Sequence, residues 1–593
     1  MMRLWRWLTE RLTDPRAPWV AVALGVLLTL GSLGNGIVLD DFYHRQVLVD
    51  GVGYLGERHA SWDLFNFFPE RPGLRAEAQQ SGLWPWWMGD VAVAFFRPIS
   101  SLTHALDYAL WPDRYALMHL HSLLWYAALL AIAATAYRRL FGPGLATGLA
   151  CLLYALDGGH GLAVGWLATR NMIVAATFSV AAFTLHDAHR RHGFRHGAWL
   201  SPLALLLALC SAELAIGILG YLVAYAFFLD PARGWRRLLT LAPHVGVVVI
   251  WKVVYRVLGF GSRGTGLYTH PFEAPGVFLE AIVERWPVLV TSQLTLPFAD
   301  FAGIPPPWAD PIVAAVMLLI GAPLAIYLLA PLVRSDARAR VLAAGALMAA
   351  VPCCTTLPHT RLLILVGFGF FGLLGLLVAR QAAGDEPTSR PRRVVTGLVV
   401  GRHLVLGAVL LASGATGPRL FGAILDRAYD SVPSGPEITE QTLVVVNAPH
   451  AFLSSFVPIA RRQRGEPAPL KLRTLGTTMG EVRVTRRGPK TLLLETPGGY
   501  LEGRPHHVMW DPRDRRDPGY RVDLGDMVIE VVRSTPDGRP QAVEVRLDRV
   551  PGPQHRWIVW DADGFVPFSL PQPGETTTLP ALDIEEVVFG AAS

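Results

Sequence analysis

The chain carries little charge for its length. Only 17% of its 593 residues are Asp, Glu, Lys or Arg, against about 25% in an average soluble protein, and 52% are hydrophobic. The deficit is uneven, because apolar blocks fill the first two thirds while acidic residues and arginines gather in the last third. This composition excludes a single soluble globular domain. It predicts a large membrane domain followed by a smaller soluble one.

Cysteine is scarce, and it is absent from the whole carboxyl-terminal third. All four cysteines lie in apolar blocks, so the soluble part is not held together by disulfide bonds, whatever its compartment. The adjacent pair Cys353 and Cys354 is expected to pack at a helix end and not to carry redox chemistry.

Lysine is nearly absent, so the net charge of +6 comes from arginine. The arginines form short clusters between apolar blocks, a pattern that orients helices in a bilayer, and no nucleic-acid partner is expected. The sequence also lacks a P-loop, an H-E-x-x-H motif and a G-x-S-x-G motif. Soluble nucleotide chemistry therefore has no motif to support it.

Eleven apolar blocks have the composition of membrane helices, which need about 20 mainly apolar residues each. The first follows a basic amino-terminal stretch and has no A-x-A-like cleavage site, so we expect a retained anchor with a cytoplasmic amino terminus. Basic clusters after every second block then place the carboxyl-terminal part outside, in a multi-pass protein of a bacterial inner membrane. The blocks are 19–39, 114–137, 144–156, 170–185, 198–210, 214–229, 238–255, 311–333, 341–357, 362–380 and 394–413.

A further block, 278–298, would break this alternation if it crossed the membrane. It contains Glu280, Glu284 and Arg285, so we expect an amphipathic helix lying in the outer membrane interface.

After about residue 417 the pattern changes to short β-rich runs separated by Gly, Pro and Asp. The predicted fold is a polytopic α-helical membrane protein with a β-rich extracytoplasmic domain. We expect the membrane domain at 1–416, with a large first outer loop at 40–113, and the β-rich domain at 417–593.

Ionisable residues at membrane depth are costly, so each is a candidate for function. On the expected topology nearly all of them lie on the outer side, while the inner side shows only orienting arginine clusters. This one-sided distribution predicts a site at the outer face. The candidates are Asp40, Asp41, His160, Arg170, Glu213, Lys252, Arg256, His359 and Arg361.

Segment 97–111 has the pattern of an amphipathic helix. Polar residues, among them Arg97 and His104, recur at three-to-four spacing, and leucines occupy the opposite face. We expect an interfacial helix whose polar stripe is turned toward the site. A helix that merely floats on lipid headgroups fits this segment equally well.

Several motifs occur in a fixed order along residues 30–375. GNGIVLDDF at 34–42 and FRPISSLTHALDYALWP at 96–112 are the more specific ones, followed by ALDGGHGLAVGWLATRN, SAEL and RLLILVGFGF. Together they resemble the motifs of GT-C class membrane glycosyltransferases, most of all bacterial relatives of the O-mannosyltransferases with transmembrane and TPR domains. The carboxyl-terminal part carries no TPR-like repeat, so acceptor handling is expected to differ.

The resemblance implies transfer of a sugar from a polyprenyl-phosphate donor to an extracytoplasmic acceptor, which is a protein hydroxyl, a lipid or an envelope glycan. Asp40 or Asp41 would be the catalytic base. Arg361 and Arg170 would bind the donor phosphate, because a guanidinium pairs with two phosphate oxygens at once. The supporting residues would be Arg97, His104, His160, Glu213, Lys252, Arg256 and His359.

The chain departs from the family pattern at several positions. Asp157 replaces a histidine, Leu162 stands where a glutamate is expected, and Ala212 replaces a lysine. The departures are compatible with another donor or acceptor, or with an inactive member.

Other functions remain open. A transporter or flippase of a lipid-linked intermediate predicts polar groups on both faces and near the midplane. A non-catalytic membrane assembly protein predicts that the outer-face residues can be replaced without effect. No cofactor is firmly implied, although Asp40, Asp41 and Glu213 could together hold a divalent cation.

Overall fold

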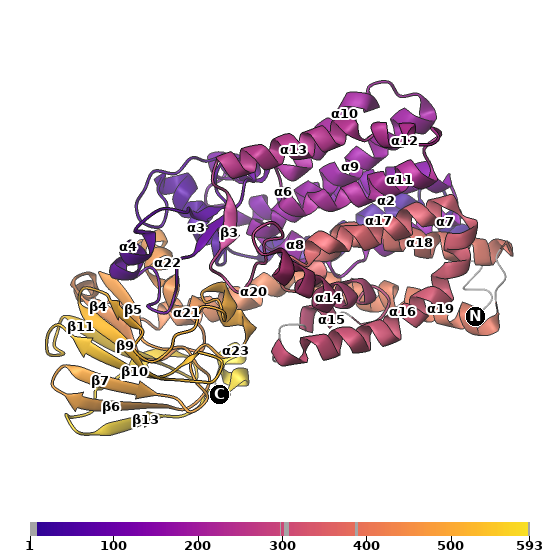
Figure 1. The fold of residues 1–593 in the computed structure, drawn as a ribbon. Coiled ribbons are helices and arrows are strands. Elements are labelled where there is room, and N and C mark those ends of the chain that lie inside the picture. Colours follow the sequence, from indigo (N-terminus) through magenta and orange to yellow (C-terminus); the bar gives the residue numbers. More distant parts are fainter. Residues whose placement is uncertain (1–8, 297, 302–306, 386–388, 591–593) are drawn as a thin grey trace.

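The computed structural model describes residues 9–296, 298–301, 307–385 and 389–590. They form a helical bundle and a β-rich domain, and much of the first outer loop lies where the two meet (Figure 1). Each of the eleven expected blocks lies largely within helix. The helices are α2 (Ala17–Thr29), α6 (Tyr115–Phe141), α7 (Leu145–Ala155), α9 (Arg170–His192), α10 (Gly197–Leu209), α11 (Ile218–Phe228), α13 (Ala242–Val257), α16 (Asp310–Ser335), α17 (Ala337–Cys353), α18 (Ile364–Ala383) and the run of α19 (Arg390–Arg402), η7 (His403–Gly407) and α20 (Ala408–Asp430).

Six helical runs within the described residues are long and apolar enough to cross a bilayer. Large apolar side chains on the outside of the bundle remain uncovered by protein: Leu319 on α16 is 75% exposed and Val405 in η7 is 69% exposed. Lipid is the environment that such surfaces require. The chain is therefore a multi-pass membrane protein. The six runs are Ala17–Gly34, Tyr115–Phe141, Leu167–His192, Asp310–Ser335, Thr360–Ala383 and Arg390–Asp430.

Small residues allow the helix interruption after α7 to pack closely. The short helix α8 (His160–Gly165) crosses α20, and a methyl group added at Gly165 would lie 2.3 Å from the carbonyl oxygen of Ala415. Only glycine permits this approach of two backbones. The contact fixes the 3₁₀ turn η3 (Leu167–Thr169) and the start of α9.

The block at 278–298 differs from its expected position. It forms α14 (Pro275–Thr291), which enters the bundle instead of lying along the outer interface. Arg285 donates a hydrogen bond to the carbonyl of Cys354 at the end of α17 (3.0 Å), whereas Thr291 packs against Gly321 near the middle of α16. By Asp300 the chain has returned to the start of α18, where Asp300 accepts a hydrogen bond from the amide of Thr360 (2.8 Å). The expectation of an interfacial helix is corrected to a re-entrant one.

At the tip of this re-entrant segment, backbone carbonyl groups accept hydrogen bonds from side chains in the middle of the α19–α20 run. Arg402 donates to the carbonyl of Ser292 (3.2 Å), and the ring of His403 bonds to the carbonyl of Gln293 (2.8 Å). Non-helical backbone at membrane depth needs such partners, because no water is available there. The run widens into the π-helical turn η7 at this point, a feature that often marks functional sites.

The β-rich domain contains two sheets. One is antiparallel with the strand order β13-β6-β7-β10-β9-β8; in the other, β12-β11-β4-β5, strand β4 runs parallel to both β11 and β5. The boundary expected near residue 417 lies inside α20, which continues to Asp430 and packs Leu425 and Tyr429 into this domain. The strands are β4 (Thr442–Val445), β5 (Lys471–Thr474), β6 (Val482–Gly488), β7 (Thr491–Glu495), β8 (Arg521–Asp523), β9 (Met527–Ser534), β10 (Pro540–Leu547), β11 (His555–Asp561), β12 (Gly564–Pro567) and β13 (Thr576–Leu579).

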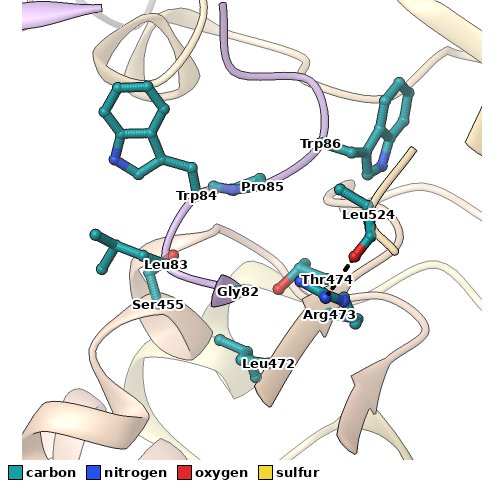
Figure 2. Close-up of a pocket in the computed structure, with 10 residues that line it drawn as sticks. All are labelled: Gly82, Leu83, Trp84, Pro85, Trp86, Ser455, Leu472, Arg473, Thr474 and Leu524. Atoms are coloured by element: carbon teal, nitrogen blue, oxygen red, sulfur yellow. Dashed lines mark hydrogen bonds between the residues drawn. The ribbon is translucent and has the colours of Figure 1, made fainter. Parts of the chain in front are cut away.

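The first outer loop contributes side chains to the core of the β-rich domain. Trp86 and Trp87 are each 1% exposed and belong to the same apolar cluster as Trp510. Arg516 donates two hydrogen bonds to the carbonyl of Trp87 (2.8 and 3.0 Å). Figure 2 shows the adjoining stretch from Gly82 to Trp86 beside β5. The loop and the domain therefore form one packed unit.

A small three-stranded sheet brings two loops of the membrane domain together. Strands β1 (Asn66–Phe68) and β2 (Ala92–Ala94) come from the first outer loop, and β3 (Gly261–Arg263) follows α13. Strand β2 pairs with both of the others. This pairing places the segment after β3 beside the residues that precede α5 (Pro98–Leu110).

Candidate functional site

Asp40 begins α3 (Asp40–Arg45), the short helix that opens the first outer loop. The residue before it, Leu39, has φ 47° and ψ −112°, a backbone conformation that a side-chain-bearing residue rarely adopts. Such strain costs on the order of 1–3 kcal/mol and tends to occur where function requires it. The turn at Leu39 sets the direction in which Asp40 leaves the backbone.

Asp41 has a different environment from its neighbour. It is 2% exposed, and its two carboxylate oxygens accept hydrogen bonds from the amides of Val38 (3.0 Å) and Ala168 (2.9 Å). Burial raises the pKa of Asp41 to about 8, against the opposing effect of these bonds. Asp41 therefore ties the outer loop to η3, and Asp40 is the carboxylate of the pair that remains open.

Two arginines face Asp40 from separate elements. Burial raises the pKa of Asp40 to about 6, while the positive charges of Arg361 and Arg97 act in the opposite direction. A carboxylate whose pKa lies near 6 is well suited to accept a proton close to neutral pH.

Arg97 is held in place by an ion pair and by aromatic rings. Its Nη2 lies 2.7 Å and its Nε 2.9 Å from one carboxylate oxygen of Glu213, in the 3₁₀ turn η4 (Glu213–Gly217). The guanidinium carbon lies 4.3 Å from the centre of the Phe95 ring and 5.1 Å from that of Phe65. The predicted pair of supporting residues, Arg97 and Glu213, is thus brought together beside Asp40.

Arg361 lies in the turn η6 (Thr360–Leu363) at the start of α18. Its Nε is buried without a hydrogen-bond partner among the described residues, and its guanidinium carbon lies 5.9 Å from the Trp166 ring. Such an unsatisfied donor calls for a ligand or water. Arg361 also lines an apolar pocket between α9, α17 and α18, together with Met172, Ala176, Leu214, Ala349 and Leu365.

Arg170 is buried inside the protein, where other side chains and carbonyls engage it. It is 0% exposed; Nη1 lies 2.5 Å from Asp107, and Nε and Nη2 donate to the hydroxyl of Ser122 (2.8 Å) and the carbonyl of Met118 (2.7 Å). The guanidinium is fully engaged by α5 and α6. This geometry is that of a residue that positions helices, which differs from the phosphate-binding role expected for it.

The helix α5 presents its polar stripe to the protein interior, as expected from its periodicity. Ser100, His104 and Asp107 are buried, whereas Leu102 is 52% and Leu110 57% exposed. A helix floating on headgroups would leave its polar stripe uncovered by protein as well, so that alternative is wrong.

The His104 ring lies 5.1 Å from that of His44, and burial lowers the pKa of both. His104 thus packs as a neutral, desolvated side chain against His44 of α3, the helix that begins with Asp40.

The remaining predicted residues lie around the site at different depths. His160 is fully buried, with Nδ1 3.2 Å from the Tyr126 hydroxyl, and His359 pairs with Asp300 (3.1 Å). Lys252 lies over the Tyr255 ring at 4.9 Å, while Arg256 on the same helix is exposed. None of these four side chains has a direct contact with Asp40 among the described residues.

Two tyrosines of the site have no signal in the sequence. Tyr268 lies in the loop after β3, packs edge-on against Phe95 at 5.4 Å, and feels the charges of Arg97, Arg361 and Asp40. Tyr54 lies within electrostatic reach of Asp40 from another side. Both sit in irregular loops without periodicity. Only the pairing of β2 with β3 could have indicated Tyr268.

The three carboxylates considered for a divalent cation, Asp40, Asp41 and Glu213, have separate partners. The described part of the chain holds no group of three or more His, Cys, Asp or Glu residues that could hold a metal ion. Asp41 is engaged by backbone amides and Glu213 by Arg97, so these two do not converge on Asp40.

The fold matches several solved membrane glycosyltransferases at low similarity. AglB, the oligosaccharyltransferase of Archaeoglobus fulgidus solved with an inhibitory peptide and a dolichol-phosphate, is 11% identical over 79% of this chain and 66% of its own, with a TM-score of 0.40. ArnT from Cupriavidus metallidurans, bound to undecaprenyl phosphate, is 14% identical over 78% and 90%, with a TM-score of 0.37. The arabinofuranosyltransferase AftD from Mycobacteria is 16% identical over 74% and 31%, with a TM-score of 0.34.

The resemblance to a glycosyltransferase family rests on the sequence motifs, because likenesses of this size carry no argument of their own. The chain spans about two thirds of the AglB chain and about a third of the AftD chain. Identities of 16% or less with TM-scores below 0.5 say nothing about substrate or site residues here. No family model and no curated protein sequence matches the chain.

Proposed function

We propose that this protein is a membrane glycosyltransferase that moves a sugar from a polyprenyl-phosphate donor to a hydroxyl-bearing acceptor. The reaction takes place at the outer face of a bacterial inner membrane, where the first outer loop and the β-rich domain meet. The acceptor is a protein hydroxyl, a lipid or an envelope glycan.

The observation that carries the proposal is the environment of Asp40. The residue is partly exposed, burial raises the pKa of its carboxyl to about 6, and the positive charges of Arg361 and Arg97 act on it. In the proposed step the acceptor oxygen bonds to the anomeric carbon while its proton passes to Asp40. The bond between that carbon and the phosphate oxygen breaks, and its electron pair leaves with the polyprenyl phosphate.

Arg361 is the residue proposed to bind the donor phosphate. Its Nε has no hydrogen-bond partner among the described residues, and the side chains that line the small pocket beside it are mainly apolar, which matches a phosphate that carries a lipid chain. Arg97 adds positive charge on the same side of Asp40, oriented by Glu213. A guanidinium at the leaving oxygen stabilises the charge that develops there.

Arg170 and Asp41 are proposed as positioning residues. Arg170 joins α9 to α5 and α6 through Asp107 and Ser122, and Asp41 joins α3 to η3. Asp41 acts on the site through α3, which carries Asp40, and Arg170 acts through α5, which Arg97 directly precedes.

The test is sugar transfer by the purified protein in lipid nanodiscs. Radiolabelled sugars on polyprenyl phosphate are supplied with extracts of the membrane and envelope as acceptor. Transfer should fall by about 10²–10⁴-fold for Asp40→Asn, the range that a general base typically contributes. Arg256→Gln is the matched control, because Arg256 is exposed and is not one of the charges that shift the pKa of Asp40.

Two results would count against the proposal. One is the absence of transfer from every donor offered to the wild-type protein. The other is unchanged transfer by Asp40→Asn, which would exclude this carboxylate as the base.

A further inference from the structure

A cleft of about 590 Å³ lies between the start of the first outer loop and the β-rich domain. The outer loop contributes α3 and the π-helical turn η2 (Gln46–Asp50), and the domain contributes α22 (Val457–Gln463). Its volume falls within the range of small-molecule sites in proteins. The polar side chains that line it are Arg45, Gln46, Asp50, Tyr54, Arg462 and Gln463.

Several polar groups of this cleft lack a protein partner. Among the described residues, Arg462 makes no hydrogen bond or ion pair, although it is close enough to Asp50 to feel its charge. The Oε1 of Gln463 and the Nε of Arg45 are buried without hydrogen-bond partners. Arg462 is itself exposed, but buried polar atoms are normally paired, so the free atoms of Gln463 and Arg45 point to a ligand.

The backbone around the cleft is nevertheless well fixed. Gln463 donates through Nε2 to the carbonyl of Phe42 (2.7 Å), and Gln46 donates to the carbonyl of Gly53 (2.6 Å). The other end of the Arg45 guanidinium pairs with Asp113 (3.2 Å). The free atoms therefore sit on side chains that are already oriented, which lowers the cost of binding.

The cleft adjoins the proposed base. Arg45 follows Asp40 by five positions on one helix, roughly 7–8 Å at 1.5 Å per residue. Tyr54 lies within electrostatic reach of Asp40 and also lines the cleft. A molecule held here would lie near Asp40, to which it could present a hydroxyl.

We propose that this cleft binds the acceptor, and that the acceptor is an anionic glycan. The inference rests on the proposed glycosyl transfer and names its substrate class. Arg462 and Arg45 bind the carboxylate or phosphate of the glycan, and Gln463 accepts a hydrogen bond from one of its hydroxyls.

The chemistry of the lining favours this class of acceptor. Guanidinium groups recognise carboxylate and phosphate in bidentate fashion. Amide and carboxylate side chains such as those of Gln46, Gln463 and Asp50 match the hydroxyls of a sugar. A lipid tail would need an apolar lining, which the cleft provides only at Val49, Val52 and Ile459.

The test measures binding directly on the full-length protein in nanodiscs. The probes are a trimer of galacturonic acid and its fully methyl-esterified, neutral counterpart. We expect the anionic trimer to bind at least tenfold more tightly, and Arg462→Gln to abolish that difference. Equal affinity for the two trimers, or no binding of either, would overturn the inference.

Arg464→Gln is the control for a general effect of charge. Arg464 is one residue beyond α22, but its guanidinium is paired with Asp426 and with Asp430 (2.6 Å). It should leave the preference for the anionic trimer intact. An equal loss in both variants would show long-range attraction only and would contradict a specific site.

A second readout separates this inference from the proposed reaction. Asp40→Asn should keep its affinity for the anionic trimer while transfer is lost. In the transfer assay, Arg462→Gln should raise the KM for acceptor at least tenfold and leave the KM for donor unchanged. Transfer that proceeds with an unaltered acceptor KM would overturn the cleft assignment and leave the reaction standing. Trimer binding without any transfer would do the opposite.

Discussion

Asp40 and Asp41 are adjacent in sequence, yet their surroundings divide them. The carboxylate of Asp41 accepts hydrogen bonds from two backbone amides and is buried. Asp40 is partly exposed, and the charges of two arginines act on it. The sequence marks the pair but cannot separate its members, because the amide of Ala168 comes from a distant turn. The residues can be told apart by experiment.

The first prediction concerns the pH dependence of transfer. The pKa of Asp40 is raised to about 6, so the base is charged above this pH and protonated below it. We expect kcat/KM to fall about tenfold per pH unit below 6. Removing the charge of Arg97 with Arg97→Gln should move this acidic limb to higher pH, because that charge lowers the pKa of Asp40. A limb that stays in place would contradict the assignment.

The second prediction concerns stability. In Asp41→Asn one amide, that of Val38 or Ala168, loses its acceptor, which costs about 1–3 kcal/mol. Thermal unfolding in detergent is best followed near pH 4, where the raised pKa of Asp41 costs the folded state little, and it should show a lower Tm. Asp40→Asn should be as stable as the wild type or more so. The pKa of Asp40 rises from 3.8 to about 6 on folding, so this carboxyl makes the folded state less stable as the pH rises toward 6, and asparagine removes that cost. Equal Tm values for wild type and Asp41→Asn would refute the structural role.

At the scale of elements, the sequence predicts helix positions and the orientation of α5 well, because both follow from apolar periodicity. It fails for α14. Its amphipathic pattern is shared by helices that lie on a membrane and by helices that enter one among polar partners. The decisive partners, Arg402 and His403, are more than a hundred residues away. The same limit applies to Arg170, whose charge suggested phosphate binding until its contact with Asp107 was visible.

The third prediction tests the re-entrant segment. Arg402→Met removes the donor to the carbonyl of Ser292 and leaves it unsatisfied in the membrane interior. We expect a loss of stability of about 1–3 kcal/mol, measured as a lower Tm in nanodiscs. Arg256→Met, at an exposed position of another helix, should change the Tm little. The description of α14 as re-entrant would be wrong if both variants behaved alike.

At the scale of the whole molecule, the outer loop and the β-rich domain are interlocked. The fourth prediction is that Trp87→Ala lowers stability by about 3–5 kcal/mol, the usual cost of removing a buried tryptophan. Limited proteolysis should then cut residues 51–95 in the variant and spare them in the wild type. Trp62→Ala, at a residue that is 43% exposed, serves as the comparison and should resist cleavage.

The fifth prediction addresses orientation in the membrane, which the proposed reaction requires. A cysteine introduced at Arg549, whose side chain is 77% exposed in the β-rich domain, should react with a membrane-impermeant maleimide in intact cells. A cysteine at Arg195, exposed in the loop before α10, should react only after lysis. The reverse pattern would place the site on the cytoplasmic side.

The contact between Arg516 and the carbonyl of Trp87 joins residues 429 positions apart. A ribosome adding 5–20 residues per second needs roughly 20–90 s to cover that separation. During this interval the two tryptophans of the loop have no partner, and the segment that carries Asp40 has no finished cleft beside it. We therefore expect the nascent chain to be inactive until its last domain has been exported and folded. The time needed for synthesis then sets the delay before activity begins.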